Sequence, residues 1–404
     1  MSTSLLYHGF GLVGYRYVRQ EFREGQVIFH IEQPRERLRC PHCRSEEVWA
    51  QGSSARTFRT VPIGHKPVLL QFKVPRVLCF ACGRVRQVKL GFADPKKHYT
   101  RAFERYVLEL SRHMTIQDVA QHLQVSWDTV KDIQARSLQR RFGKPKLHKL
   151  RQIAIDEIAI GKGHHYLTVV LNLVSGAVVF VGDGKGAEAL TPFWRRLRRA
   201  RAKIVAVATD MSAAYIRAVR DHLPRAVHVF DHFHVIKLFH EKLSALRREL
   251  YHQLSSDRDR KVLKGTRWLL LKNPENLDPE RNERQRLTEA LRLNAPLATA
   301  YYLKEDLRQI WSQPNKRIAR RVLRDWLARA RVSGVRILAQ LADTIESYQE
   351  GILAYYDYPI STGPLEGTNT KIQAMKRQAY GFRDREFYKL KILGIHETKH
   401  ALVG

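Results

Sequence analysis

The chain has 404 residues, and its 71 lysines and arginines outnumber 39 aspartates and glutamates, so the formal net charge is +32. This length exceeds one compact core of ordinary size and predicts several domains. So positive a charge favours a polyanion, above all nucleic acid, because each neutralised phosphate releases counterions. An anionic membrane surface is the weaker alternative. The uncharged run at residues 166–182 is interrupted by polar residues, so it predicts two strands and no membrane helix.

The first predicted domain, residues 1–92, is a small zinc ribbon. Residues 26–32 and 68–77 alternate apolar and polar side chains, as ribbon strands do. The chain contains two C-x-x-C pairs, formed by Cys40, Cys43, Cys79 and Cys82. Each pair presents two thiolates to one tetrahedral ion, so we expect one structural Zn²⁺; four free thiols are the alternative. His42 lies inside the first pair, and four thiolates leave it no place among the ligands.

The second predicted domain, residues 93–150, is a helix-turn-helix followed by a basic linker. An apolar face at helical spacing is formed by Ile116, Val119, Ala120 and Leu123. Ser126 fits the cap of a second helix, whose exposed residues are predicted to be Trp127, Asp128, Thr129, Lys131 and Asp132. We take three of these as DNA contacts, because the second helix of this motif enters the major groove: Trp127, Thr129 and Lys131. A plain core hairpin is the alternative.

The third predicted domain is an α/β core of the ribonuclease-H type. The pattern predicts strands, and helices between them, in the order β-β-β-α-β-α-β. The strands are expected at residues 152–160, 166–173, 177–181, 203–208 and 226–230, and the helices at 187–201 and 213–222. A five-stranded mixed sheet follows from that order. We expect the core to comprise residues 151–235 and 358–404, separated by an all-helical insertion at 236–357.

Two carboxylates on predicted strands of this core are candidates for metal binding. Asp156 lies within an apolar strand, where a buried charge is costly unless it is paired or binds a metal. Its neighbour Glu157 points to the other face, and the apolar pattern does not choose between the two. Asp210 ends another apolar strand, where α/β sheets bind ligands. Ser212 could cap the next helix in its place, which would leave Asp210 free.

A third carboxylate, Glu366, lies in the first turn of a predicted helix, with Pro364 at the first helical position. The helix dipole alone would favour an acid there. The same helical face carries Asn369, Gln373 and Lys376, and the opposite, buried stripe carries Leu365, Ile372, Met375 and Ala379. Further DNA contacts are predicted at Lys371, Lys376 and Arg377. Together the three carboxylates could hold two Mg²⁺ ions for phosphodiester chemistry.

Several segments together resemble the ISL-three family of bacterial insertion-sequence transposases: the zinc ribbon, the helix-turn-helix, the Ala-Ile-Asp-Glu strand, Ala-Thr-Asp-Met-Ser, Asp-His-Phe-His and Gly-Pro-Leu-Glu-Gly. The resemblance spans nearly the whole chain. It implies that Asp156, Asp210 and Glu366 form a DDE triad, which favours Asp156 over Glu157. It also implies two Mg²⁺ or Mn²⁺ ions, terminal inverted repeats and target DNA as partners, and a homodimer or larger oligomer. We expect a cytoplasmic, nucleoid-associated bacterial protein with no membrane partner.

Asp231 and His234 match an Asp-x-x-His pattern of related transposases, and the resemblance implies that they support the active site. A strand end followed by a helix cap is the structural alternative. The function expected is DNA cleavage followed by strand transfer. A non-catalytic DNA-binding regulator with the same ribbon and helix-turn-helix is the alternative, and a nuclease that cuts without joining is a third.

Overall fold

The computed structural model describes residues 5–161 and 163–402. It divides into two compact units, Met1–Arg140 and Arg141–Gly404.

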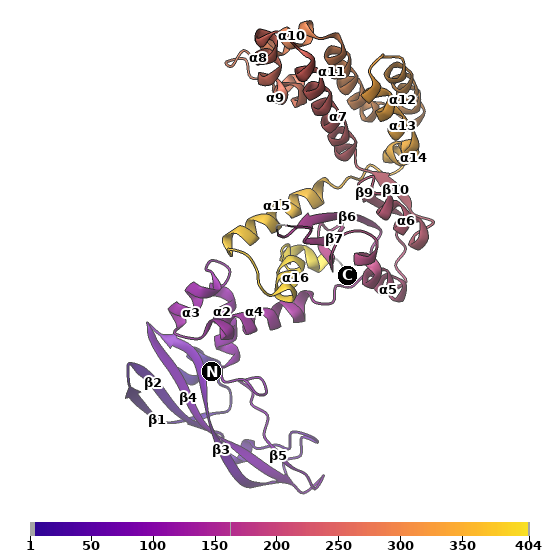
Figure 1. The fold of residues 1–404 in the computed structure, drawn as a ribbon. Helices are drawn as coiled ribbons and strands as arrows, with labels where there is room; N and C mark the ends of the chain where they lie inside the picture. Colours follow the sequence, from indigo (N-terminus) through magenta and orange to yellow (C-terminus); the bar gives the residue numbers. More distant parts are fainter. Residues whose placement is uncertain (1–4, 162, 403–404) are drawn as a thin grey trace. The chain divides into compact units, whose positions relative to one another are not determined.

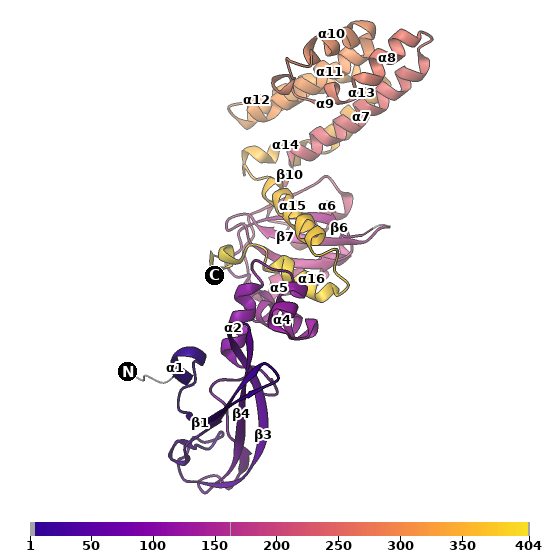
Figure 2. The same ribbon diagram turned by 90° about the vertical axis from the view of Figure 1, so that its left-hand side faces the viewer.

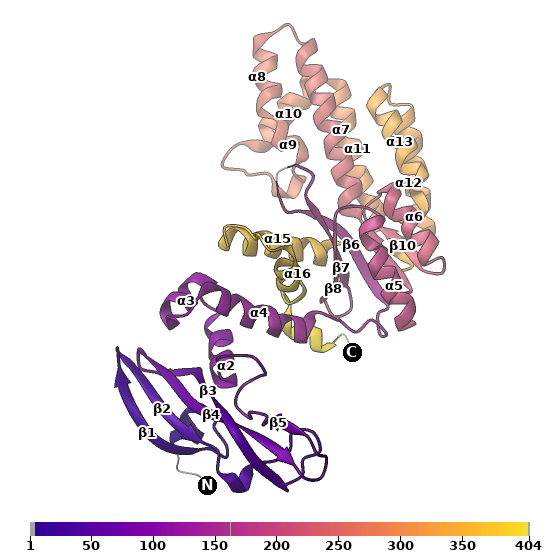
Figure 3. The ribbon, with the colours of Figure 1, turned by 60° about the horizontal axis from the view of Figure 1, so that its bottom comes forward.

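The first unit is built on a five-stranded sheet (Figure 3). Its order is β1-β2-β4-β3, and β5 pairs with β4. The strands are β1 Arg16–Arg23, β2 Gln26–Glu32, β3 Val48–Ile63, β4 Lys66–Cys79 and β5 Val85–Gln87, with the short helices α1 Leu5–Phe10 and η1 Arg35–Arg37. The two strands predicted from alternation are confirmed, and they pair in parallel as β2 and β4. Phe58, Val68 and Leu70 are fully buried in the core of this sheet.

Three helices belong to the same unit: α2 Arg101–Leu110, α3 Ile116–Leu123 and α4 Trp127–Phe142. Thr115 and Asp118 form a capping box at the start of α3. Gln124 ends α3 in the left-handed conformation, with φ 52°. Ser126 then caps α4, because its Oγ accepts a 3.2 Å hydrogen bond from the N–H of Thr129. The predicted helix-turn-helix is therefore confirmed.

The helix-turn-helix packs on the sheet through both apolar and polar contacts. Its buried residues are Val119, Ala120, Leu123, Val130 and Ile133. Arg59 of β3 donates from Nη2 to the Leu123 carbonyl at 2.8 Å, which satisfies a carbonyl at the end of α3. The hydroxyls of Thr60 and Thr100 lie 3.0 Å apart between β3 and the cap of α2.

The second unit contains a five-stranded mixed sheet in the order β10-β9-β6-β7-β8 (Figure 1). Its elements are β6 Gln152–Ala159, β7 Tyr166–Asn172, β8 Val178–Asp183, η2 Glu188–Leu190, α5 Thr191–Ala200, β9 Ala206–Thr209, α6 Ala213–His222 and β10 Val227–Phe230. The predicted order of strands and helices is confirmed. β6 pairs antiparallel with β7 and parallel with β9, and β10 continues the parallel half.

The uncharged run forms the hairpin of β7 and β8, as predicted. Among the described residues, none of the helices combines the length and apolar character that crossing a bilayer requires. The basic linker is part of the folded second unit, because its residues Leu147 and Leu150 are buried in the core beneath the sheet.

Between β10 and residue 357 the described chain is helical, as predicted. The elements are α7 His232–Gln253, α8 Asp257–Gly265, α9 Arg267–Leu271, η3 Pro274–Asn276, α10 Glu283–Leu293, α11 Ala295–Arg308, η4 Gln309–Ser312, α12 Lys316–Arg331, α13 Arg336–Ser347, α14 Gln349–Leu353 and η5 Ala354–Tyr356. The long helix α7 packs against α11 and α13 (Figure 2). Phe239 and Trp326 are fully buried at the centre of this apolar core.

The chain then returns to the sheet as α15 Gly363–Gln378, followed by α16 Arg385–Leu393 and η6 Glu397–Leu402. Leu365 and Ile372 are buried in α15, as predicted, and Thr368 joins them. The predicted burial is only partly correct for Met375 and is wrong for Ala379. Met375 is half-buried, and Ala379 is exposed because the helix ends at Gln378.

Candidate functional site

The four cysteines converge on one point, and among the described residues theirs is the one group of at least three possible ligands whose atoms all lie within 4.8 Å of one another. The Sγ atoms of Cys40 and Cys82 are 3.8 Å apart, and those of Cys43 and Cys79 are 3.5 Å apart. Four sulfurs at about 2.3 Å from a tetrahedral zinc would be separated by about 3.8 Å. The donor set and its spacing therefore fit one zinc ion, and His42 is outside the set.

The backbone of the first knuckle favours a thiolate. The N–H groups of Cys43 and His42 lower the pKa of Cys40 to about 6. The N–H of Ser45 likewise favours a Cys43 thiolate, yet the contacts with Cys79, Cys40 and Cys82 together with burial outweigh it and raise the Cys43 pKa to about 12. The sulfurs around Cys43 thus oppose its ionisation, and a bound cation removes that opposition.

In the helix-turn-helix, the predicted DNA contacts differ in exposure. Trp127 is 43 % exposed, and the Lys131 ammonium lies 5.4 Å from the centre of its ring. Thr129 is half-buried and shares a 2.9 Å hydrogen bond with the Ser126 hydroxyl. The side chain of Asp132, which we expected to be exposed, is 45 % exposed, and it also accepts hydrogen bonds from Lys97 and Tyr99 within the unit. It thus helps to anchor α4.

Asp156 lies on β6, and Asp210 directly follows the neighbouring parallel strand β9, which ends at Thr209. The register pairs Ala154 of β6 with Ala208 of β9, two residues before each aspartate. The two carboxylates are close enough for their charges to interact. Burial raises the pKa of Asp156, and the negative charge of Asp210 adds to that rise.

Asp156 is held from two sides. Its Oδ1 accepts a 2.8 Å hydrogen bond from the N–H of Glu157, and its Oδ2 accepts one of 2.8 Å from the side-chain amide of Asn369 on α15. Gln373, one turn further along α15, donates to the Ala159 carbonyl at 2.7 Å. The polar face predicted for this helix therefore contacts β6.

Glu157 has a different environment on the opposite face of the sheet. Its Oε1 accepts hydrogen bonds from the Tyr215 hydroxyl at 2.8 Å and from the Gly186 N–H at 3.0 Å. Tyr215 belongs to α6, so α6 and α15 cover opposite faces of β6. The Glu157 carboxylate is thus engaged in holding α6, whereas Asp156 faces α15.

Asp210 is less free than the sequence suggested. Ser212 occupies the capping position of α6, but its side chain makes no capping hydrogen bond. The Ser212 N–H donates to Asp210 Oδ1 at 3.0 Å. One carboxylate oxygen of Asp210 is therefore oriented by the backbone.

Glu366 is exposed in the first turn of α15, three residues before Asn369. Residues three apart share a helical face, so Glu366 lies on the face that contacts β6. The three carboxylate groups do not converge within the 4.8 Å that the cysteines satisfy. On the same helix, Lys371 and Arg377 are exposed and Lys376 is half-buried.

Asp231 and His234 lie at the junction between β10 and α7. Asp231 is 1 % exposed, caps α7 through the Phe233 N–H and accepts a hydrogen bond from Thr362. Burial opposes its ionisation, but contacts from His234, Thr362 and the Phe233 N–H outweigh burial and lower its pKa. Asp231 in turn raises the pKa of His234, and the charges of Asp156 and Asp210 contribute.

The cap expected of Asp231 is therefore present, but His234 is not satisfied. Its Nδ1 lies 3.5 Å from Asp231 Oδ2 and has no hydrogen-bond partner. Sequence reasoning missed Asn369 and Thr362 as partners of these carboxylates. The spacing of Asn369 from Glu366 was a usable signal, whereas the contact of Thr362 with Asp231 had none.

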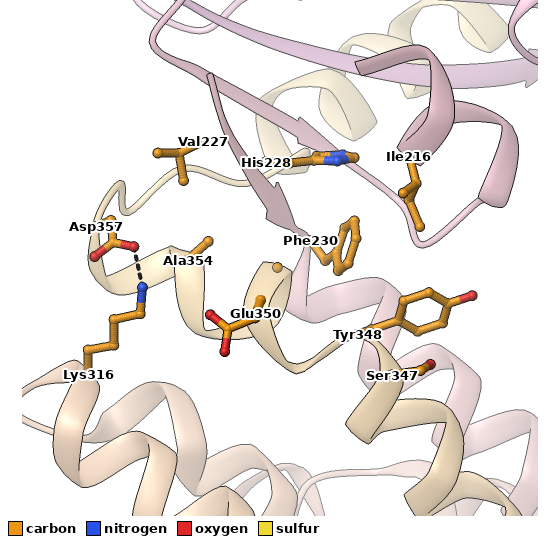
Figure 4. Close-up of a pocket in the computed structure, with 11 residues that line it drawn as sticks. Ile216, Val227, His228, Phe230, Lys316, Ser347, Tyr348, Glu350, Ala354 and Asp357 are labelled. Atoms are coloured by element: carbon orange, nitrogen blue, oxygen red, sulfur yellow. Dashed lines mark hydrogen bonds and ion pairs between the residues drawn. The ribbon is translucent and has the colours of Figure 1, made fainter. Parts of the chain in front are cut away.

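A separate pocket of about 470 Å³ lies beside the edge strand β10 (Figure 4). Val227, His228 and Phe230 line one side, and the ion pair of Lys316 with Asp357 lies at another. The predicted active-site residues do not line this pocket.

Family models match three successive parts of the chain. Residues 36–82 match the zinc-finger of transposase IS204/IS1001/IS1096/IS1165, residues 88–137 match the helix-turn-helix domain of transposase family ISL3, and residues 153–392 match the transposase domain of the DDE type in that family.

Whole-chain relatives agree with these matches. The chain is 33 % identical over 388 residues to the transposase for insertion sequence element IS1001 of Bordetella parapertussis, covering 95 % of each. It is 30 % identical over 374 residues to the transposase for IS1557 of Mycobacterium tuberculosis, covering 85 % of this chain and 82 % of that one. The solved Drosophila P element transposase strand transfer complex is 14 % identical to this chain. The match covers 66 % of this chain and 81 % of that one, with a TM-score of 0.33.

Both the domain matches and the whole-chain identity indicate the same class of protein. The family decides between the enzyme and the regulator weighed above. The chain belongs to transposase family ISL3 and is an insertion-sequence transposase of the DDE type, an enzyme that cuts and joins DNA.

Proposed function

We propose that Asp156, Asp210 and Glu366 are the catalytic DDE carboxylates and that they hold two Mg²⁺ or Mn²⁺ ions. The observation that carries this assignment is the 2.8 Å hydrogen bond from Asn369 to Asp156, which joins the helix of Glu366 to the strand of the first aspartate. The register of β6 and β9 supports Asp210 as the second carboxylate, because Asp210 directly follows β9, two residues beyond Ala208, the partner of Ala154.

The electrostatics of these residues fit divalent cations. Asp156 is buried enough to raise its pKa, and Asp210 adds a like charge beside it. A bound cation would remove this cost and keep both groups ionised. Two ions about 4 Å apart need carboxylates spread more widely than a single coordination sphere, which agrees with three groups that do not converge on one point.

The ions would supply activation of the attacking oxygen and stabilisation of the leaving oxygen of a phosphodiester. The chain's own residues would set the geometry. Asn369 and the Glu157 N–H fix both oxygens of Asp156, and the Ser212 N–H fixes one oxygen of Asp210. We assign Asp231 and His234 a supporting role, since His234 Nδ1 lies 3.5 Å from Asp231 Oδ2 and the charges of Asp156 and Asp210 act on His234.

The reaction would proceed in two steps at one site. Hydrolysis of the phosphodiester at the element end breaks its bond to the 3′-oxygen and leaves a 3′-hydroxyl. That hydroxyl then attacks a phosphodiester of the target DNA, forming a new bond and releasing a target 3′-hydroxyl. No external energy source is required, because hydrolysis of a phosphodiester is favourable and strand transfer exchanges one phosphodiester bond for another.

We further propose a ribonuclease-H-like core, residues 151–235 and 358–404, interrupted by a helical insertion at 236–357. The mixed sheet and the return of α15 to β6 support this interpretation. The zinc ribbon, residues 1–92, and the helix-turn-helix with its linker, residues 93–150, would bind terminal inverted repeats.

The proposed contacts to repeat and target DNA are Trp127, Thr129, Lys131, Lys371, Lys376 and Arg377. Trp127, Lys371 and Arg377 are exposed, and Thr129, Lys131 and Lys376 are partly exposed. The active form would be a homodimer or larger oligomer that pairs two element ends. Light scattering of the protein with and without end DNA tests the stoichiometry, and one chain per pair of ends would exclude this assembly.

The first test uses purified protein and a plasmid that carries the element with its flanking DNA. We expect Mg²⁺-dependent breaks at the element ends and joined products with wild type, and none with EDTA. Glu366→Gln and Asp156→Asn should lower cleavage by more than about 100-fold, beyond the loss typical of outer-shell partners. Breaks without joined products would indicate a nuclease instead of a transposase.

Glu157→Gln is the matched control, because it changes a carboxylate on the same strand but on the opposite face. The amide oxygen can still accept from Tyr215 and Gly186. Cleavage should remain within a few-fold of wild type. Loss of activity in Glu157→Gln together with an active Asp156→Asn would reverse the assignment of the first carboxylate.

A further inference from the structure

Trp268 is a large aromatic side chain that the active-site assignment leaves unexplained. It is 65 % exposed on the short helix α9, whereas the next two residues, Leu269 and Leu270, are 3 % and 1 % exposed. The preceding Thr266 is also buried, and its hydroxyl donates to the Leu263 carbonyl. The segment therefore anchors itself on both sides of a tryptophan that faces solvent.

A buried lysine holds this segment in place. Lys304 of α11 is completely buried, and its Nζ donates to the Leu270 carbonyl at 2.9 Å and to the Lys272 carbonyl at 3.0 Å. Glu305 supplies an ion pair at 2.7 Å. Burial of an ammonium group is costly unless it is paired and hydrogen-bonded. Here the lysine satisfies carbonyls at the end of α9.

The chain after α9 is fixed as well. Lys272 forms an ion pair with Glu283 at 2.6 Å, and the buried Glu283 also accepts the Asp278 N–H at 2.8 Å. These contacts cross-link the segment that follows Trp268. An exposed aromatic on so constrained a backbone would lose little conformational entropy when it binds a partner.

Three arginines lie close to one another where α7 packs against α8 and α9: Arg247, Arg248 and Arg267. The Arg267 guanidinium lies 4.7 Å from the centre of the Trp268 ring. Burial lowers the pKa of Arg247, and the positive charges of Arg267 and Arg248 lower it further. Arg247 donates from Nη1 to the Leu263 carbonyl at 3.1 Å, and in the described part of the chain none of the three arginines forms an ion pair with an acid. The cluster is thus self-repelling and would be stabilised by an anion.

We propose that Trp268 and these three arginines form a second DNA-binding surface, at which the indole stacks on the base of an unpaired nucleotide and the arginines bind its phosphates. Every base has a face on which an aromatic ring can stack, but duplex DNA offers that face only at ends and unpaired positions. A second copy of this chain is a poor occupant, because the same cationic cluster would face it. The surface acts independently of the metal site.

The test measures binding of the full-length, zinc-loaded protein to a short fluorescent single strand and to a blunt duplex of the same sequence, in buffer without Mg²⁺ or Mn²⁺. Loss of one stacked base should raise Kd for the single strand about tenfold in Trp268→Ala, equivalent to about 1.4 kcal/mol. Trp268→Phe should retain most of the affinity. Duplex binding should change less than threefold. Because no catalytic metal is supplied, failure of the catalytic assignment cannot affect this result.

Tyr302→Ala is the matched control, since Tyr302 is 60 % exposed on the same helical region but precedes Glu305 and Asp306 in place of a cationic cluster. It should bind both DNAs as wild type does. Three outcomes would overturn the proposal: wild-type binding by Trp268→Ala, an equal loss on both DNAs, or a change in oligomeric state with DNA binding intact.

A second measurement uses wild-type protein and so does not depend on the folding of a variant. A single strand substituted with 5-bromodeoxyuridine is irradiated in the complex, and the cross-linked peptide is identified by mass spectrometry. We expect the peptide that contains Trp268. Cross-links confined to other parts of the chain would contradict the stacking contact.

Discussion

Asn369 is the residue through which α15 reaches the first aspartate. Its amide nitrogen donates to Asp156 Oδ2 at 2.8 Å, while its Oδ1 is buried and has no hydrogen-bond partner. A neutral donor fixes the orientation of a carboxylate without adding charge to a site that already contains Asp210. We regard Asn369 as a positioning residue in the proposed site.

Asn369→Ala should lower DNA cleavage by about 10–100-fold and raise the Mg²⁺ concentration needed for half-maximal activity, as loss of outer-shell partners does. A Mg²⁺ titration of the cleavage rate measures both effects. Gln373→Ala is the control, because it removes the other hydrogen bond from α15 to β6 but touches no carboxylate. Equal effects of the two variants would mean that Asn369 only anchors the helix.

His228 makes the stability of the fold depend on pH. Burial lowers its pKa to about 4, and its Nε2 lies 2.7 Å from the Thr209 hydroxyl next to Asp210. The unfolded chain binds this proton with a pKa of about 6.5. The unfolded state therefore takes up the proton first as pH falls. The stabilising contribution of neutral His228 is complete above about pH 6.5 and is lost as pH falls towards 4.

We expect His228→Gln, which retains a donor for Thr209 but does not titrate, to flatten the fall in Tm between about pH 6.5 and pH 4. Near pH 4, the change in the free energy of unfolding that His228 causes should approach about 3 kcal/mol, because each unit of pKa difference between the folded and unfolded states corresponds to about 1.4 kcal/mol. Thermal unfolding across this range measures it. The exposed His252→Gln should leave the profile as it is, and identical profiles for His228→Gln and wild type would contradict the prediction.

At the scale of elements, the zinc centre connects turns that the sheet alone does not hold. Cys79 is the last residue of β4 and is fully buried, whereas Cys43 is exposed in the turn before β3. The ribbon strands bring the two knuckles together, and the ion would then cross-link them. Folding and metal binding are coupled in such an arrangement.

Cys79→Ser should reduce the zinc content well below one ion per chain and lower the Tm of the first unit. Metal analysis by mass spectrometry and thermal unfolding measure the two effects. His42→Ala should retain zinc, because His42 contributes only its backbone N–H to Cys40 Sγ, at 3.4 Å. A comparable loss of zinc in His42→Ala would place the histidine among the ligands.

At the scale of the whole molecule, the net charge of +32 sets how binding depends on salt. Every phosphate neutralised adds to the negative slope of log K against log salt concentration. If the complex makes about 6–10 phosphate contacts, affinity for DNA should fall by about 10³–10⁵ between about 50 and 200 mM salt.

Fluorescence anisotropy with an element-end duplex across this range measures the slope. Lys131→Ala should make the slope shallower by about one unit if Lys131 contacts a phosphate. Val332→Ser, at an 83 % exposed position, should not change it. Binding that is independent of salt would contradict an electrostatic origin of the affinity.

The sequence by itself determined the features that depend on local pattern. The C-x-x-C spacing, the capped helix-turn-helix and the order of strands and helices were all predicted, because short-range periodicity and capping specify them. The β2 strand was predicted residue for residue. The apolar periodicity did not decide between Asp156 and Glu157, and only the family resemblance favoured Asp156.

The tertiary structure decided which side chains meet across long sequence separations. Asn369 reaches Asp156, Tyr215 engages Glu157, and Thr362 donates to Asp231, although none of these pairs is close in sequence. The complete burial of Lys304 could not be predicted from local pattern either, since a lysine in an amphipathic helix is ordinarily expected to be exposed. Local pattern specifies faces and turns, but the pairing of faces follows from the packing of the whole unit.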